Sequence, residues 1–238
     1  MKKYSDFKIT LKEGVYDPGI FKAFFLAGGP GSGKTFVTAQ AFAGTGLKVV
    51  NSDSAFEKGL KQANLSLKMP DEEEYFRNLI RQRAKTTTQT MLDTYVQGRL
   101  GLIVDATGRD LSLVQRQVAQ LRNLGYDCYM VFVNTSLNVA IERNKARTRS
   151  IPEYIVKKSW EGVQANIGAF QRIFSPNKML IVDNNRSEQE LVSQTLNTAA
   201  KFIRSKLTTK PENGIALSWI KKELELKRRW DLKITTKQ

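Results

Sequence analysis

Residues 21–35 read FKAFFLAGGPGSGKT, an apolar run followed by a glycine-rich loop and the start of a polar segment. The loop matches the pattern G-x-x-x-x-G-K-[ST], with a strand predicted before it and a helix after it. Glycines let consecutive backbone N–H groups turn toward phosphate oxygens, and a match with both flanks in place argues against a chance glycine turn. The predicted nucleotide-binding residues are Gly28, Gly29, Pro30, Gly31, Ser32, Gly33, Lys34 and Thr35.

Apolar runs alternate with helical patterns along the rest of the chain, which predicts a parallel sheet with helices on both faces. The predicted strands are Phe21–Gly28, Leu47–Ser52, Gly101–Asp105, Cys128–Val133 and Met179–Val182. The predicted helices are Lys34–Ala43, Asp71–Gln97 (one helix or two), Leu111–Leu124, Ser136–Arg147, Pro152–Gln171, Glu188–Lys206 and Ile215–Trp230. We therefore expect an α/β P-loop domain with five parallel strands over residues 1–210, and a basic amphipathic tail over 211–238.

Composition limits the chemistry that the chain can perform. The 238 residues include no histidine and one cysteine, Cys128, which excludes Ser-His-Asp catalysis and structural zinc. The net charge of +15 favours a polyanionic partner, although a lysine-rich surface that serves solubility is the alternative. No apolar run is long enough for a membrane span and no signal peptide is visible, so we expect a cytoplasmic protein without a membrane partner.

Two carboxylates follow predicted strands, where residues of a doubly wound sheet face the ligand crevice. Asp105 ends the third strand and is expected to hold Mg²⁺ together with Thr35. Asp53 follows the second strand and could accept a proton from an attacking hydroxyl. The alternative for each residue is a capping or turn role without catalysis.

A basic segment lies between the fourth strand and Pro152. Arg143 and Arg147 are four residues apart and share a helix face, and Arg149 follows in the loop. Arginines on a mobile lid over residues 143–152 could clamp the charge that develops on a transferring phosphoryl group. A solvated basic helix face is the alternative.

The glycine loop, the Asp after strand two and the sequence Glu-Arg-Asn-x-x-Arg before Ile-Pro together resemble the polynucleotide kinase and zeta-toxin branch of P-loop kinases. The resemblance covers roughly Phe21 to Lys206, and its motifs are specific only at the loop. It implies that Asp53 occupies the position of the general base and that Arg147 is the lid arginine that contacts the transferring phosphate. It also places Arg143 in that lid motif and Asp105 among the site carboxylates.

The chain also departs from that pattern. Phage polynucleotide kinase has a substrate-reading arginine three residues after its base, where this chain has Phe56, and its phosphatase domain has no counterpart here. Zeta toxins share the Asp-[Ser/Thr] step of Asp53-Ser54 and act on a nucleotide sugar. The resemblance therefore supports a hydroxyl kinase more strongly than it supports either acceptor.

The predicted reaction is in-line transfer of the γ-phosphate of ATP, with Mg²⁺, to a hydroxyl near Asp53; Lys34, Arg143 and Arg147 would balance the charge. We expect adenine to lie near residues 183–186. A nucleic-acid hydroxyl is the first choice of acceptor, a nucleotide or nucleotide sugar the second, and a hydroxymethylated base in DNA the third.

The first choice depends on the tail, where residues 201–238 carry eleven Lys or Arg against four Asp or Glu. Trp219 and Trp230 lie beside this charge and could stack on bases, unless the helix packs Leu217, Ile220 and Leu224 onto the core. Outside the kinase class, the alternatives are an ATPase or GTPase switch and a nucleic-acid-binding module that keeps a P-loop. The sequence has no clear N-K-x-D motif, and Asp105 is followed by Ala106, which disfavours a GTPase and an ATP-driven motor.

Overall fold

The computed structural model describes residues 14–105, 107–147, 150–185 and 189–235. Its sheet has five parallel strands in the order β2-β3-β1-β4-β5. They are β1 (Lys22–Ala27), β2 (Lys48–Val50), β3 (Leu102–Asp105), β4 (Asp127–Asn134) and β5 (Met179–Asp183). All five predicted strands are present, so the predicted parallel sheet is confirmed.

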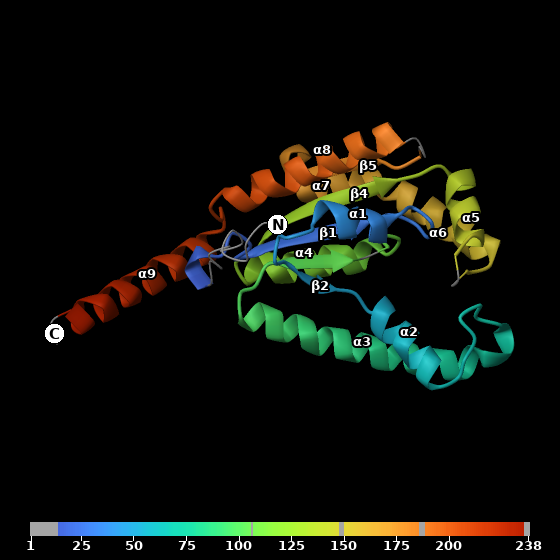
Figure 1. The fold of residues 1–238 in the computed structure, drawn as a ribbon, viewed down its shortest axis with the longest axis horizontal. Coiled ribbons are helices and arrows are strands. Elements are labelled where there is room, and N and C mark those ends of the chain that lie inside the picture. Colours follow the sequence, from blue (N-terminus) through green and yellow to red (C-terminus); the bar gives the residue numbers. More distant parts are fainter. Residues whose placement is uncertain (1–13, 106, 148–149, 186–188, 236–238) are drawn as a thin grey trace, which may run out of the picture.

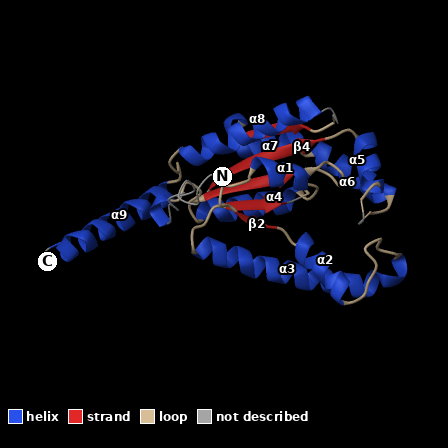
Figure 2. Cartoon of the chain, in the orientation of Figure 1, coloured by secondary structure: helices blue, strands red, loops and turns tan. Residues whose placement is uncertain are grey.

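Helices cover both faces of the sheet (Figures 1 and 2). Phe24 and Leu26 of β1 point into one core, which is closed by α1 (Lys34–Ala41) and α8 (Gln189–Thr208). Ala23 and Phe25 point into the other core, closed by α3 (Glu74–Gln97), α4 (Leu111–Asn123), α6 (Glu153–Ala165) and α7 (Ile167–Phe174). Because β1 is buried on both faces, its side chains are apolar without alternation, apart from Lys22.

The structure contains a helix that the sequence analysis did not predict, α2 (Asp53–Gln62), directly after β2. It packs on the first half of α3 through Phe56, Leu60 and Ala84, which form a small cluster of their own. Asp53 is the first residue of α2, so this helix fixes the position of the predicted general base. Residues 71–73 form a short 3-10 turn, and α3 continues from it as one long helix.

The helix predicted over Pro152–Gln171 is two helices, α6 and α7, which meet at Asn166. The Asn166 amide donates hydrogen bonds to the backbone carbonyls of Gly108 and Arg109, both at 3.0 Å. These bonds tie the break to the loop after β3. A polar side chain that satisfies distant carbonyls has thus interrupted a pattern that looked continuous in sequence.

The chain closes with α9 (Gly214–Thr235), which extends away from the body on the side opposite α5 (Leu137–Lys145) and α6 (Figure 1). Its first turns dock where strands begin: Trp219 packs edge-on against Phe21, which precedes β1, with ring centroids 5.6 Å apart. The Arg99 guanidinium, near the start of β3, lies 4.4 Å from the Trp219 ring centroid. Among the described residues, no helix is long and apolar enough to cross a membrane.

Candidate active site

The glycine loop joins the carboxyl end of β1 to the first turn of α1, as predicted. Gly31 and Gly33 have φ values of +78° and +86°, in the left-handed region that glycine alone adopts at low cost. A Cβ on Gly31 would lie 2.2 Å from the Ala140 carbonyl oxygen, and one on Gly33 would lie 2.2 Å from Asn184 Nδ2. Both glycines are therefore required by backbone conformation and by close neighbours.

Neighbouring elements support the outside of the loop through the Ser32 carbonyl. That carbonyl accepts hydrogen bonds from Asn184 Nδ2 at 2.7 Å and from the Thr135 hydroxyl at 3.2 Å. Trp160 of α6 donates to the Thr135 carbonyl at 2.6 Å, and its backbone lies against Gly29. The Ser32 hydroxyl is buried in the loop, and no side chain or backbone group of the described residues bonds to it.

Lys34 begins α1, Asp105 ends β3 and Asp53 begins α2, and the three residues act on one another electrostatically. Burial lowers the pKa of the Lys34 ammonium, and the charges of Asp105 and Asp53 oppose that shift. Burial raises the pKa of Asp105, Lys34 opposes the rise and Asp53 adds to it. The Lys34 ammonium donates to the Gly28 carbonyl at 2.6 Å, so it lies across the loop where phosphate oxygens would bind.

Asn51 links the Asp105 side chain to the Asp53 backbone and was not predicted as a site residue. Its Nδ2 donates to Asp105 Oδ2 at 2.7 Å, and its Oδ1 accepts from the backbone N–H of Asp53 at 2.7 Å. One amide therefore orients the Asp105 carboxylate and secures the first turn of α2. Asn51 positions both predicted acidic residues.

The structure places Arg143 beside the glycine loop. Its Nη1 donates to the Asn184 carbonyl at 2.7 Å, and the same nitrogen would lie 3.8 Å from a Cβ built on Gly33. Asn184 therefore bonds to the glycine loop through its side-chain amide and to Arg143 through its backbone carbonyl. The guanidinium is fixed at the end of α1 that a phosphate would approach.

The second predicted arginine, Arg147, lies in the turn after α5 and is exposed. It is close enough to Lys34 for its charge to lower the pKa of that ammonium. Asn144, in the last turn of α5, is buried. Its side-chain amide exchanges hydrogen bonds of 2.8 and 3.2 Å with the backbone of Ile151. Arg149 and Arg186, at the predicted lid and adenine positions, lie outside the described residues.

The oxygen ligands at this edge of the sheet suit Mg²⁺. The Thr35 hydroxyl is exposed in the first turn of α1, and one oxygen of Asp105 is oriented by Asn51. Among the described residues, no group of three or more His, Cys, Asp or Glu could hold a metal ion by itself. Mg²⁺ usually keeps few protein ligands and binds substrate phosphates as well, so Thr35 and Asp105 fit such an ion.

Three residues that shape the site were missed from the sequence: Asn51, Thr135 and Trp160. Asn184 lies within the segment expected near adenine, but its hydrogen bond to the glycine loop was not predicted. Asn51 and Thr135 follow strands directly, so the rule that singled out Asp53 and Asp105 also applied to them. They were passed over because an amide or a hydroxyl suggests no charge chemistry. Trp160 carries no such signal in the sequence.

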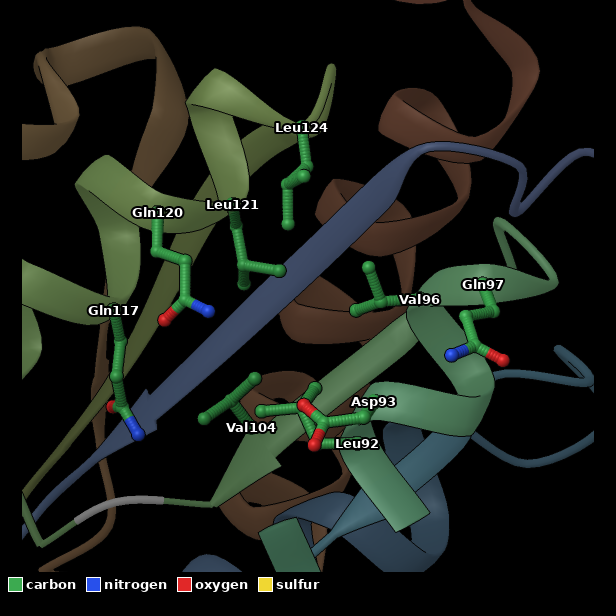
Figure 3. A pocket seen from close by; sticks show the side chains of 9 residues that line it. All are labelled: Leu92, Asp93, Val96, Gln97, Val104, Gln117, Gln120, Leu121 and Leu124. Carbon is green, nitrogen blue, oxygen red and sulfur yellow. The ribbon is translucent and has the colours of Figure 1, made fainter. Parts of the chain in front are cut away.

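A cavity of about 210 Å³ lies between α3 and α4 over β3 (Figure 3). Its floor is apolar, and glutamines and Asp93 line its rim. The lining residues are Leu92, Asp93, Val96, Gln97, Val104, Gln117, Gln120, Leu121 and Leu124. None of them is a predicted site residue, so the cavity is separate from the glycine loop.

Comparison with solved structures shows the fold that this chain shares. A proposed kinase from Chloroflexus aurantiacus superposes with a TM-score of 0.56 at 18% identity, covering 79% of this chain and 98% of that one. The AvrRxo1-ORF1:-ORF2 complex with ATP gives 0.54 at 12% identity, covering 83% and 79%. The PezAT toxin–antitoxin system of Streptococcus pneumoniae gives 0.49 at 15% identity, covering 79% and 88%.

Sequence comparison gives the family. No curated protein sequence matches the chain. The model of a family described as AAA domain, AAA_33, matches residues 24–170, from β1 into α7. Since this match covers more than half of the chain, the protein belongs to that AAA domain family, and its five-stranded parallel sheet is that of the P-loop kinases, as its sequence predicts.

Proposed function

We propose that the protein is an ATP-dependent kinase that transfers the γ-phosphate of ATP to a hydroxyl group activated by Asp53. The observation that carries this proposal is the electrostatic coupling of Lys34, at the start of α1, with Asp105 and Asp53, which follow two other strands. A simple nucleotide-binding switch would need the glycine loop and Asp105. It would have no need for a second acidic residue whose backbone is held by the asparagine that orients Asp105.

In the proposed mechanism, the glycine loop binds the phosphates of ATP through backbone N–H groups and the Ser32 hydroxyl. Asp53 orients the acceptor hydroxyl and accepts its proton as the γ-phosphoryl group moves in line to the acceptor oxygen. Lys34, Arg143 and Arg147 stabilise the negative charge on the transferring group. Mg²⁺, when bound near Thr35 and Asp105, would neutralise charge on the β- and γ-phosphate oxygens.

For the acceptor, we propose a hydroxyl on nucleic acid, as in the polynucleotide kinase branch. Support comes from the net charge of +15 and from the basic residues that α9 exposes. The hydroxyl could be the 5′ end of a strand or a hydroxymethylated base within DNA, since the transfer chemistry is the same. A nucleotide or nucleotide sugar, as in the zeta-toxin branch, is the competing acceptor.

The test follows γ-labelled ATP with Mg²⁺ into four acceptor pools. The pools are 5′-hydroxyl DNA and RNA oligonucleotides, DNA that contains hydroxymethyluracil, free nucleosides and nucleotides, and nucleotide sugars. We expect label on one of the two nucleic-acid pools. Label on a small molecule alone would contradict the proposed acceptor and keep the kinase, whereas release of phosphate with no labelled acceptor would contradict the kinase.

The Asn51→Ala variant is expected to lower kcat about tenfold and to move the acid limb of the kcat/KM profile to higher pH. Burial already raises the pKa of Asp105, and loss of the Asn51 donor destabilises the carboxylate further. Activity that needs the ionised carboxylate is lost as pH falls through that pKa, so a higher pKa moves the loss upward. Asn197→Ala, an exposed asparagine on α8, is the control, and an Asn51→Ala profile that matches the parent would contradict this role.

A further inference from the structure

The distal half of α9 is largely exposed, although Lys227 within it contacts Tyr16 of the body. From Leu224 to Trp230 every residue is exposed, and the helix projects beyond the body (Figure 1). Trp230 is 69% exposed, whereas Trp219 is half-buried against Phe21 and is not available to stack on a base. Ala216 and Ile220 pack on the core, but Leu217 and Leu224 are exposed. The helix therefore packs on the core through its first turns, and Lys227 adds a contact further along.

The basic residues of α9 gather on its outward side. Ala216 and Ile220 face the body, and Lys227 lies two turns further along the same side, with its ammonium 4.7 Å from the Tyr16 ring centroid. At 100° per residue, the opposite side carries Lys221, Lys222, Arg228 and Arg229, with Glu225 among them. We call these four cations the outward face. Its two pairs are seven residues, or about 10 Å, apart along the helix axis.

We propose that α9 binds the phosphate backbone of a nucleic-acid strand along the outward face. Paired cations about 10 Å apart match a polyanion better than a single small anion. Trp230 is not part of this face, because at 100° per residue it lies on the side of Ala216 and Lys227. A lipid surface fits less well. The exposed apolar residues of the distal half are Leu224, Leu226 and Trp230. Glu223 and Lys227 separate Leu224 from the other two around the helix, so the three form no continuous apolar face.

This surface lies at the end of the molecule opposite the glycine loop. α9 docks on the residues that precede β1, β3 and β4, and the loop follows the carboxyl end of β1. The six residues of β1 span about 20 Å. The inference rests on the proposed nucleic-acid acceptor: a strand that reaches both places must be several nucleotides long, so α9 selects long acceptors without taking part in the transfer.

The test compares two variants that remove the same charge. The first changes Lys221, Lys222, Arg228 and Arg229 to Gln. The matched control changes four exposed cations on other helices to Gln: Lys85, Arg116, Lys201 and Arg204. Fluorescence anisotropy measures binding of a single strand of about 20 nucleotides and of a trinucleotide, at about 50 and 200 mM salt.

We expect the outward-face variant to bind the long strand at least about tenfold more weakly than the parent and to show a shallower dependence of log Kd on log salt. The control should stay within about threefold of the parent, and so should Trp230→Ala, because that ring lies off the outward face. Trinucleotide binding should be equal in all variants. Equal losses in the outward-face variant and the control would overturn the proposal, because they would show a general charge effect.

Binding is measured without turnover, so its outcome is independent of the kinase assay. Label on a small molecule alone, with α9-dependent strand binding intact, would remove the acceptor proposal and leave this one standing. Binding to vesicles of phosphatidylcholine and phosphatidylserine in place of the oligonucleotide would overturn it. So would self-association through α9 that leaves strand binding unchanged in the outward-face variant.

Discussion

Replacing Lys34 with alanine is expected to lower kcat about a thousandfold or more. The ammonium crosses the glycine loop to the Gly28 carbonyl and lies in the electrostatic field of Asp105 and Asp53. Its positive charge would therefore stabilise the negative charge on the β- and γ-phosphates during the transfer. The variant should show the loss in phosphate transfer and a smaller loss in ATP affinity.

The same substitution should leave folding intact. Burial lowers the pKa of Lys34, which means that the folded protein bears a cost for the charged form, so the variant should melt at or above the parent temperature. Lys48→Ala, an exposed lysine on β2, is the matched control and should be fully active. Full activity of Lys34→Ala would contradict the mechanism.

Replacing Asp53 with asparagine is expected to lower kcat about a hundredfold to ten-thousandfold while ATP binding is retained. The substitution separates the two roles considered for this residue. Asparagine serves a helix start about as well as aspartate does, so a purely capping Asp53 would tolerate it. A general base would not, because the amide cannot accept the proton of the acceptor.

Glu57→Gln is the matched control for Asp53→Asn, since it removes a carboxylate from the same helix. Glu57 pairs with Lys61 at 3.3 Å on the surface, and loss of that pair should have little effect on activity or stability. Equal kcat values for Asp53→Asn and the parent, with unchanged melting, would remove Asp53 from the mechanism.

The sheet could be predicted from the sequence because each of its strands leaves a direct signal. Buried parallel strands are continuous apolar runs, and the glycine loop fixes which of them is β1. Helix ends were harder to predict. Asn166 breaks α6 from α7 through bonds to carbonyls some fifty-seven residues away, and no local pattern reports such a contact. A capping role for Asp53 was considered as an alternative, but the helix α2 that follows it was not predicted.

The charged residues of the candidate site could be singled out from the sequence, and its neutral residues outside the glycine loop could not. Lys34, Asp105, Asp53, Arg143 and Arg147 carry charges that suggest chemistry, and the structure brings Lys34, Asp105, Asp53 and Arg147 into one electrostatic neighbourhood. The side chains that hold these charged residues in place were not predicted, because they are neutral amides. Asn51 and Asn184 act through hydrogen bonds whose partners come from other strands, and such partners become visible only in the fold.

The most direct test of the central claim is the fate of the γ-phosphate in a single turnover. Wild-type protein in excess over γ-labelled ATP, with Mg²⁺ and the acceptor pools present, is quenched, and the label is divided between acceptor and inorganic phosphate. The account predicts that the label appears on an acceptor hydroxyl and that Asp53→Asn loses this transfer. Label found wholly as inorganic phosphate, equally with and without acceptors, would contradict it and identify an ATPase.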